Sequence, residues 1–273
     1  DNKLVNRYNE HIHICCTSED INNIAYSLMI KEGRDLLINQ ANVLVRAIKS
    51  MGKKYKSTAM LSHTHGQPAS PTTMGKEFIN FHKRLSAQID DLKNIQIKGK
   101  FNGATGNYSA HSIAYPKVNW PLSMKRFVNS LKLEFNSHTT QIEPHDYIAD
   151  LCHKINHINS ILIGFSQDIW TYISKNYFSQ KNIKGEIGSS TMPHKINPIN
   201  FENAEGNLGM SNAISQYFAS KLTISRLQRD LSDSTVLRNT GLVYAYSIIA
   251  YKNILLGLNK LDLNKSNIAN DLD

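Results

Sequence analysis

The chain has 273 residues, with 31 Lys and Arg against 22 Asp and Glu, a formal net charge of +9 and 41% hydrophobic residues. This composition excludes an intrinsically disordered chain, and the length suffices for one large domain or two modest ones. No apolar run of about 18 residues stands out, so we expect no membrane-spanning helix. The excess positive charge suits nucleic acid, an anionic membrane surface or an anionic small substrate.

The three cysteines predict a reduced protein. Cys15, Cys16 and Cys152 are an odd number, and adjacent cysteines rarely bridge one another. No basic segment followed by an apolar leader opens the sequence, which gives no support for secretion. We therefore expect free thiols and a cytoplasmic location.

Long proline-free stretches predict helices, because the seven prolines cluster in the segments between them. The first helix is expected to start at Thr17, where Thr17 and Asp20 resemble a capping box. Its apolar face runs from Leu37 to Met51, and Gly52 marks its end. A second helix is expected over about residues 72–98, ending at Gly99.

The third stretch carries the clearest periodic pattern. Apolar residues alternate by three and four from Ile148 to Tyr172, and a similar run extends from Leu237 to Leu258. Such a 3.5-residue repeat is typical of long helices packed at shallow angles, and helices of about 25–30 residues are roughly 40 Å long. One monomer of this size cannot cover both sides of several such helices. The sequence therefore predicts an all-α, long-helix bundle completed by other subunits.

Polar segments between the helices hold the candidate catalytic residues. Residues 185–198 read Gly-Glu-Ile-Gly-Ser-Ser-Thr-Met-Pro-His-Lys-Ile-Asn-Pro, a loop that can wrap a carboxylate and bring a hydroxyl to it, although an ordinary surface loop is the alternative. Residues 62–69 include His63 and His65, and histidine is the side chain best matched to proton transfer near neutral pH.

A metal site is an alternative interpretation of the first residues, where metal-ligand types occur at His11, His13, Cys15 and Cys16. However, the sequence has no Cys-x-x-Cys pair and no His-Glu-x-x-His motif. Structural or solvated histidines are the more economical interpretation, and the same holds for the pair at 153 and 157.

Two further segments are weaker candidates. Residues 103–111 are small enough to let backbone approach a ligand, but they match no phosphate or dinucleotide loop. In residues 226–238, Arg229 and Arg238 flank hydroxyls, which suits a phosphate or carboxylate site, with a salt-bridged helix face as the alternative. The lysines are scattered and no nucleic-acid-binding pattern is present, so an anionic small substrate accounts best for the charge.

Together these segments resemble a known enzyme family. Residues 188–198 match every fixed position of Gly-Ser-Ser-x-Met-Pro-x-Lys-x-Asn-Pro, the signature loop of the fumarase/aspartase superfamily. Within that superfamily the chain resembles the adenylosuccinate lyase family of the bacterial and protozoan type through residues 17–23, 64–69, 139–146 and 229–239. The resemblance covers essentially the whole chain. It implies a homotetramer with one central bundle, active sites shared among three subunits, and no metal or organic cofactor.

The resemblance also implies a reaction. Fumarate is eliminated from adenylosuccinate, leaving AMP, and from the succinyl-carboxamide ribotide of purine synthesis. Ser189 is implied to be the base that removes the Cβ proton, and His65 the acid that protonates the leaving nitrogen. We expect closure of the 185–198 loop, with Lys195, to stabilise the serine alkoxide. The alternatives are another fumarate-releasing lyase, of the argininosuccinate lyase type, and a non-catalytic tetrameric scaffold.

The substrate-binding residues implied by the resemblance have distinct roles. Those that hold the succinyl carboxylates are Thr17, Ser18, Ser190, Lys195 and Asn197. Glu202 is implied to orient His65, and those that face the nucleotide on its phosphate side are Arg229, Ser234 and Arg238. The remaining residues lining the pocket or touching the ligand are His13, Thr64, Gln141 and Asn203.

The resemblance finally implies a domain division. Members of the family are longer at both ends, so residues 1–15 would end an N-terminal domain, residues 16–260 form the central helical bundle, and residues 261–273 begin a C-terminal domain. Activity of this chain by itself is not implied. His63 stands where many relatives have arginine, so we expect a pH-dependent charge beside the candidate acid.

Overall fold

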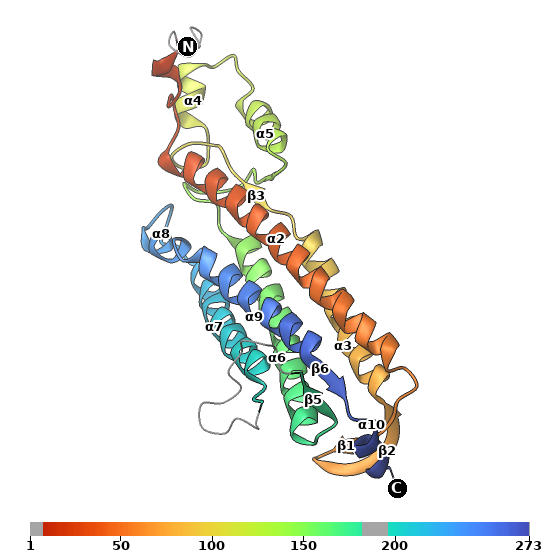
Figure 1. Ribbon diagram of the computed structural model, residues 1–273. Helices are drawn as coiled ribbons and strands as arrows, with labels where there is room; N and C mark the ends of the chain where they lie inside the picture. Colours follow the sequence, from red (N-terminus) through yellow and green to blue (C-terminus); the bar gives the residue numbers. More distant parts are fainter. Residues whose placement is uncertain (1–7, 182–195, 273) are drawn as a thin grey trace. The chain divides into compact units, whose positions relative to one another are not determined.

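The computed structural model describes residues 8–181 and 196–272, and these are mostly helical, which confirms the predicted all-α class (Figure 1). The helices are η1 (Asn9–His11), α2 (Ser18–Lys54), α3 (Met74–Asn94), α4 (Ser109–Ala114), α5 (Trp120–Ser130), α6 (Asp146–Ser174), α7 (Ile199–Lys221), α8 (Ser232–Leu237), α9 (Thr240–Lys260) and α10 (Lys265–Asn270). The strands are short: β1 (Ala59–Thr64), β2 (Gln67–Thr73), β3 (Lys98–Gly99), β4 (Glu134–Phe135), β5 (Phe178–Gln180) and β6 (Leu261–Leu263).

The chain divides into two compact units. The first unit comprises residues 1–34, 95–152 and 217–240, and the second comprises residues 35–94, 153–216 and 241–273. These ranges interleave because α2, α6 and α7 each contribute residues to both units. Each unit is therefore assembled from segments distant in sequence.

The first predicted helix is confirmed, and the second is shorter than predicted. Helix α3 ends at Asn94, four residues before the expected limit, and Lys98 and Gly99 form strand β3, which pairs in parallel with β4. The amide of Glu134 donates to the carbonyl of Ile97 at 2.9 Å. The backbone groups of this segment are thus satisfied by a neighbouring strand, so helical bonding ends earlier.

Helix α6 confirms the apolar seam. Tyr172 at the end of the predicted seam is half-buried, and the other seam residues are each at most 2% exposed: Ile148, Leu151, Ile155, Ile158, Leu162, Phe165 and Ile169. The expected run from Leu237 to Leu258 is only partly correct. It is divided between α8 and α9, Gly241 is exposed, and the buried face of α9 includes Val243, Ala250 and Ile254 instead.

In the second unit, helices α6, α7 and α9 lie side by side (Figure 1) and share a buried polar cluster. The amide of Asn159 donates to the hydroxyls of Ser211 and Ser247 at 3.1 and 3.0 Å, and its carbonyl accepts from Tyr251 at 2.9 Å. All four side chains are buried. Because buried polar groups must be paired, this cluster fixes the relative register of the three helices.

The stretch Ser232–Lys260 is long and apolar enough to cross a membrane by length and composition, with a mean hydropathy of 1.3 over its most apolar window. This corrects the expectation that the sequence contains no such stretch. The buried core helix of a folded protein passes the same test, and α9 places Ala250, Ile254 and Leu258 in the core of the second unit. Core packing therefore accounts for part of this composition, since 39% of that window is buried.

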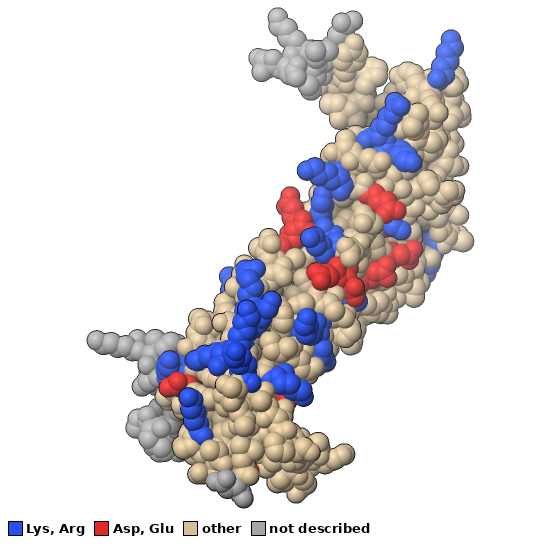
Figure 2. Space-filling view, turned by 90° about the vertical axis from the view of Figure 1, so that its right-hand side faces the viewer, with Lys and Arg blue, Asp and Glu red and all other residues tan. Residues whose placement is uncertain are grey.

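The basic charge of the chain is visible on its surface. Lys and Arg side chains occur along much of the face shown in Figure 2, with Asp and Glu side chains between some of them. Some charged residues of the chain form ion pairs, such as Lys154 with Asp91 at 3.0 Å and Lys76 with Glu77 at 3.2 Å. Exposed pairs of this kind contribute little to stability.

Candidate active site

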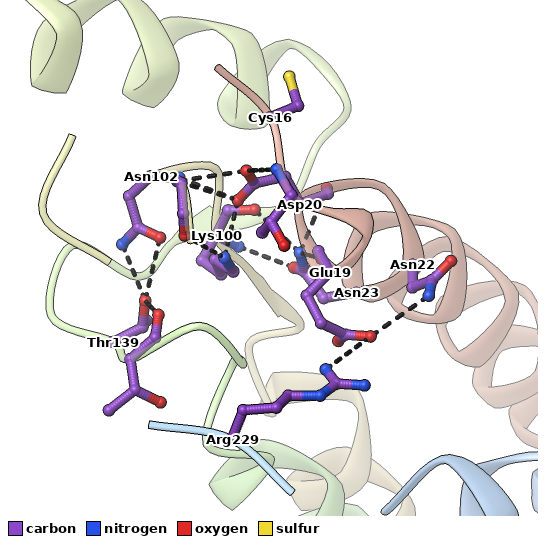
Figure 3. A network of polar contacts seen from close by, with 12 residues as sticks. Cys16, Glu19, Asp20, Asn22, Asn23, Lys100, Asn102, Thr139 and Arg229 are labelled. Carbon is purple, nitrogen blue, oxygen red and sulfur yellow. Dashed lines mark hydrogen bonds and ion pairs between the residues drawn. The ribbon is translucent and has the colours of Figure 1, made fainter. Parts of the chain in front are cut away.

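In the first unit, the start of α2 is organised around Asp20 (Figure 3). The carboxylate of Asp20 accepts a hydrogen bond from the amide of Thr17 at 3.0 Å, and the amide of Asp20 donates to the carbonyl of Thr17 at 3.0 Å. The residue predicted to take part in a capping box therefore closes the first turn of the helix. Thr17 is half-buried and Ser18 is exposed, so this turn presents its hydroxyl residues toward the surface.

Asp20 also binds a second segment of the first unit. Its carboxylate accepts from the ammonium of Lys100 at 2.7 Å, from the amide of Asn102 at 3.1 Å and from the amide of Gly103 at 3.2 Å (Figure 3). The side chains of Asp20 and Lys100 are both fully buried. Burial lowers the pKa of Lys100, and the bond to Asp20 opposes that shift.

The 100–106 segment is joined in turn to residues 139–141. The side-chain amide of Asn102 donates to the hydroxyl of Thr139 at 2.8 Å. Gly106 has φ +76°, and an added Cβ would lie 2.2 Å from the carbonyl oxygen of Thr139, so only glycine fits there. The backbone amide of Gln141 donates to the carbonyl of Gln228 at 3.3 Å. This places the predicted pocket residue Gln141 beside the Arg229 segment.

Arg229 is anchored to the first turn of α2. Its guanidinium lies 2.8 Å from the carboxylate of Glu19, with only 17% and 6% of the two side chains exposed. The neighbouring turn is fixed by Asp230, whose pKa is held well below its usual range by hydrogen bonds from Ser232 and Arg226. The first unit therefore brings together Thr17, Ser18, Gln141 and Arg229, which sequence reasoning had taken from separate motifs.

The other predicted residues of the first unit are less constrained. His13 is exposed, as is Arg238 just after α8. Ser234 is half-buried, and its backbone amide donates to the carboxylate of Asp233 at 2.7 Å. The side chains of His13 and Arg238 are therefore accessible from solvent.

In the second unit, His65 lies at the tip of the β1–β2 hairpin. Thr64 pairs with Gln67 across a two-residue turn in which His65 and Gly66 both have positive φ, +54° and +72°. Such a turn matches the twist of the two strands, and a non-glycine residue pays a conformational cost there. Both Thr64 and His65 are exposed. The hairpin thus holds His65 at an exposed position with a defined backbone conformation.

A cavity of about 180 Å³ lies beside the hairpin within the second unit. Its lining residues are Met60, Ser62, His63, Thr72, Glu77, Asp168, Thr171, Tyr172 and Lys175. The ammonium of Lys175 lies 2.8 Å from Nε2 of His63, which accepts this hydrogen bond when the imidazole is neutral. Burial, with a smaller contribution from Glu77, raises the pKa of Asp168. The expected pH-dependent group at position 63 is therefore hydrogen-bonded to a lysine.

The predicted residues near the start of α7 bond to other helical residues, and in the described part of the chain none of these bonds reaches the β1–β2 hairpin. Glu202 accepts a hydrogen bond from the indole of Trp170 at 3.0 Å, and no bond between Glu202 and His65 occurs in the described part of the chain. Asn203 accepts from the amide of Asn207, and Asn197 is half-buried just before the helix. The orientation of His65 by Glu202 stays a prediction.

Three predicted residues, Ser189, Ser190 and Lys195, lie outside the described residues. Within residues 8–181 and 196–272, no cluster of three or more His, Cys, Asp or Glu side chains could hold a metal ion. The three cysteines are free.

Sequence reasoning missed Lys100 and Asn102, which organise the site in the first unit. Lys100 looked like an ordinary member of a scattered lysine population, and its partner Asp20 lies 80 positions earlier in the chain. The small-residue segment beginning at Gly103 was the available signal, because it allows the close backbone approach that Asp20 requires.

Comparison with known proteins places the chain in a family. A family model described as "Lyase" matches residues 2–212, and one described as "Adenylosuccinate lyase C-terminal" matches residues 225–273. Adenylosuccinate lyase of Buchnera aphidicola subsp. Schizaphis graminum is 57% identical over 99% of this chain and 60% of its own length. The enzymes of Legionella pneumophila and Escherichia coli are 56% and 52% identical, each over 58% of their own lengths.

A solved structure supports the fold. The 3-carboxy-cis,cis-muconate lactonizing enzyme of Pseudomonas putida superposes with a TM-score of 0.82 at 17% identity, covering 98% of this chain and 59% of that one. The chain spans about 60% of the length of the curated relatives it matches. With a family model matched over more than half of its residues and relatives of one name at over 50% identity, the chain belongs to the lyase family and groups with the adenylosuccinate lyases.

Proposed function

We propose that the protein carrying this chain eliminates fumarate from adenylosuccinate, leaving AMP, and from the succinyl-carboxamide ribotide of purine synthesis. The observation that carries the proposal is that Arg229 pairs with Glu19 in the first turn of α2, beside Thr17 and Ser18. The chain in which this occurs is 51–57% identical to adenylosuccinate lyases. Hydroxyl groups at a helix N-terminus beside a guanidinium suit an anionic ligand with carboxylate and phosphate groups.

The proposed mechanism is acid–base elimination. Ser189 takes the Cβ proton of the succinyl group, the C–N bond breaks as the C=C bond of fumarate forms, and His65 gives its proton to the departing nitrogen of AMP. Lys195 and Asn197 hold the carboxylate where negative charge develops. His65 is exposed on a two-residue turn, which supports its proposed role as the general acid, because the acid must contact the substrate.

We further propose a homotetramer with active sites shared among subunits. In the second unit, exposed apolar side chains recur every seven residues: Leu242, Ile249 and Leu256 on α9, and Leu36 and Val43 on α2. A seven-residue spacing places such residues on one face of a helix, which is the pattern of helices that pack against other helices. The cytoplasmic location and the domain limits 1–15, 16–260 and 261–273 stay predictions.

Fumarate release tests this function. The intact protein is expected to release fumarate from adenylosuccinate, with the 273-residue chain assayed in parallel. Ser189→Ala is expected to lower kcat by at least about a hundredfold, because general-base catalysis contributes about 10²–10⁴-fold, while binding of AMP and fumarate persists. Ser130→Ala, an exposed serine on α5, is the matched control.

The alternatives give different results in the same assay. Release of fumarate from argininosuccinate but not from adenylosuccinate would identify another superfamily lyase. Release from neither substrate, without binding of AMP and fumarate, would identify a scaffold. Near-normal turnover by Ser189→Ala would refute the assignment of the base.

A further inference from the structure

The first turn of α2 contains two buried carboxylates, and each is paired with a cation from another segment of the first unit. Glu19 lies 2.8 Å from Arg229, and Asp20 lies 2.7 Å from Lys100 (Figure 3). Arg229 is 17% exposed and so can also reach a ligand, but the side chain of Lys100 is fully buried. Lys100 therefore acts through its buried partners, which are the carboxylate of Asp20 at 2.7 Å and the carbonyl of Gly103 at 3.2 Å.

The negative charge of Asp20 lies beside the turn that is proposed to bind a carboxylate of the ligand. Its carboxylate is 3.0 Å from the backbone amide of Thr17, at the turn that carries Thr17 and Ser18. Acidic residues in a first helical turn are common because they stabilise the helix dipole. In a buried setting, however, an unpaired carboxylate would repel a second anion strongly, since burial weakens solvent screening.

We propose that Lys100 is a positioning residue for the dicarboxylate ligand: by neutralising Asp20, it lets the first turn of α2 hold a succinyl carboxylate without charge repulsion. The inference rests on the proposed function, because it takes Thr17 and Ser18 as the carboxylate-binding residues. The backbone amides of Thr17, Asn102 and Gly103 also donate to the carboxylate of Asp20, and replacing the Lys100 side chain removes none of these three donors.

This role predicts a pattern across three variants that a purely structural role does not. Lys100→Met leaves Asp20 as an uncompensated anion, so affinity for a dianion falls. Asp20→Asn leaves Lys100 as an uncompensated cation, so affinity is kept although the fold is less stable. The double variant Asp20→Asn/Lys100→Met is neutral, so affinity returns toward that of the unmodified protein.

The test is calorimetric titration of the intact protein with fumarate in the presence of AMP, with folding followed by circular dichroism. Lys100→Met is expected to raise the Kd for fumarate at least tenfold, about 1.4 kcal/mol. The same substitution is expected to raise the Kd for monomethyl fumarate, a monoanion, by a smaller factor than the Kd for fumarate. Lys76→Met, which removes the cation of an exposed ion pair on α3, is the control for a general loss of positive charge.

Three outcomes would overturn the proposal: a folded Lys100→Met protein that binds fumarate within twofold of the unmodified protein, a double variant that binds as poorly as Lys100→Met, or an unmodified protein that does not bind fumarate. If Lys100→Met does not fold, the comparison of Asp20→Asn with the double variant decides, and weaker binding by Asp20→Asn contradicts the proposal. An unmodified protein that binds fumarate without turnover refutes the proposed function and leaves this inference standing.

Discussion

His111 shows how one buried titratable side chain links the site to pH. It is 1% exposed, its ring lies 4.8 Å from that of Trp120, and its Nδ1 has no hydrogen-bond partner in the described residues. Burial lowers the pKa of His111 below its ordinary value of 6.5; Asp20 raises this pKa and Lys100 lowers it, each by a smaller amount. The charged imidazolium is thus disfavoured in the folded protein.

This shift predicts an acid-dependent loss of stability. As pH falls through about 6.5, the unfolded chain binds a proton before folded His111 does, so the free energy of unfolding decreases until the folded-state pKa is passed. His111→Phe keeps an aromatic ring at this position but removes the titratable imidazole. It is therefore expected to reduce the difference between the urea midpoints at pH 7.5 and 5.5. Exposed His153→Gln is the control. An unchanged difference in His111→Phe would contradict the prediction.

Helices α2 and α3 meet through glycine in the second unit. A Cβ on Gly75 would lie 2.5 Å from the carbonyl oxygen of Gly52 and 2.5 Å from Cα of Lys56. The amide of Gly75 also donates to the carbonyl of Tyr55 at 3.0 Å. Because the neighbouring atoms belong to backbone, they cannot move aside as a flexible side chain can.

Gly75→Ala is therefore expected to destabilise the protein by about 1–3 kcal/mol or more through overpacking. Gly164→Ala, inside α6 with nothing within 4 Å of the added Cβ, is expected to stabilise it by about 0.5–1 kcal/mol. Urea denaturation of the two variants gives the comparison. Equal effects on the unfolding free energy would show that close approach is not what requires glycine at position 75.

Apolar side chains on α9 remain exposed in the single chain. Leu242, Ile249 and Leu256 are 42–52% exposed at seven-residue intervals, although the opposite face of the same helix is buried. A helix that is apolar on both faces needs a second partner, and identical subunits provide one in a symmetric assembly.

Ile249→Glu is accordingly expected to lower the mass of the intact protein in sedimentation velocity from that of a tetramer toward smaller species. Lys252→Glu, an exposed change on the same helix, is expected to leave the mass unchanged. The tetramer proposal fails if the unmodified protein sediments as a monomer, and the role of this stripe fails if Ile249→Glu leaves a tetramer intact.

The sequence by itself determined the helical class, the limits of α2, the buried seam of α6, and the resemblance that carries the proposed reaction. These follow from local signals: apolar periodicity, proline placement, capping residues and contiguous motifs, all of which act over a few turns of chain. The buried face of α9 was predicted less well, because contacts with α6 and α7, rather than the apolar periodicity of α9 itself, decide which of its residues are buried.

Only the tertiary structure decided which charges are neutralised within the site. Lys100 meets Asp20 across 80 positions, and Arg229 meets Glu19 across 210. Such pairings depend on how segments converge in three dimensions, which no local pattern encodes. The fold therefore places the cations behind the net charge of +9 in different environments. Lys100 is buried with its carboxylate partner, Arg229 is paired but partly exposed, and many other lysines are solvated.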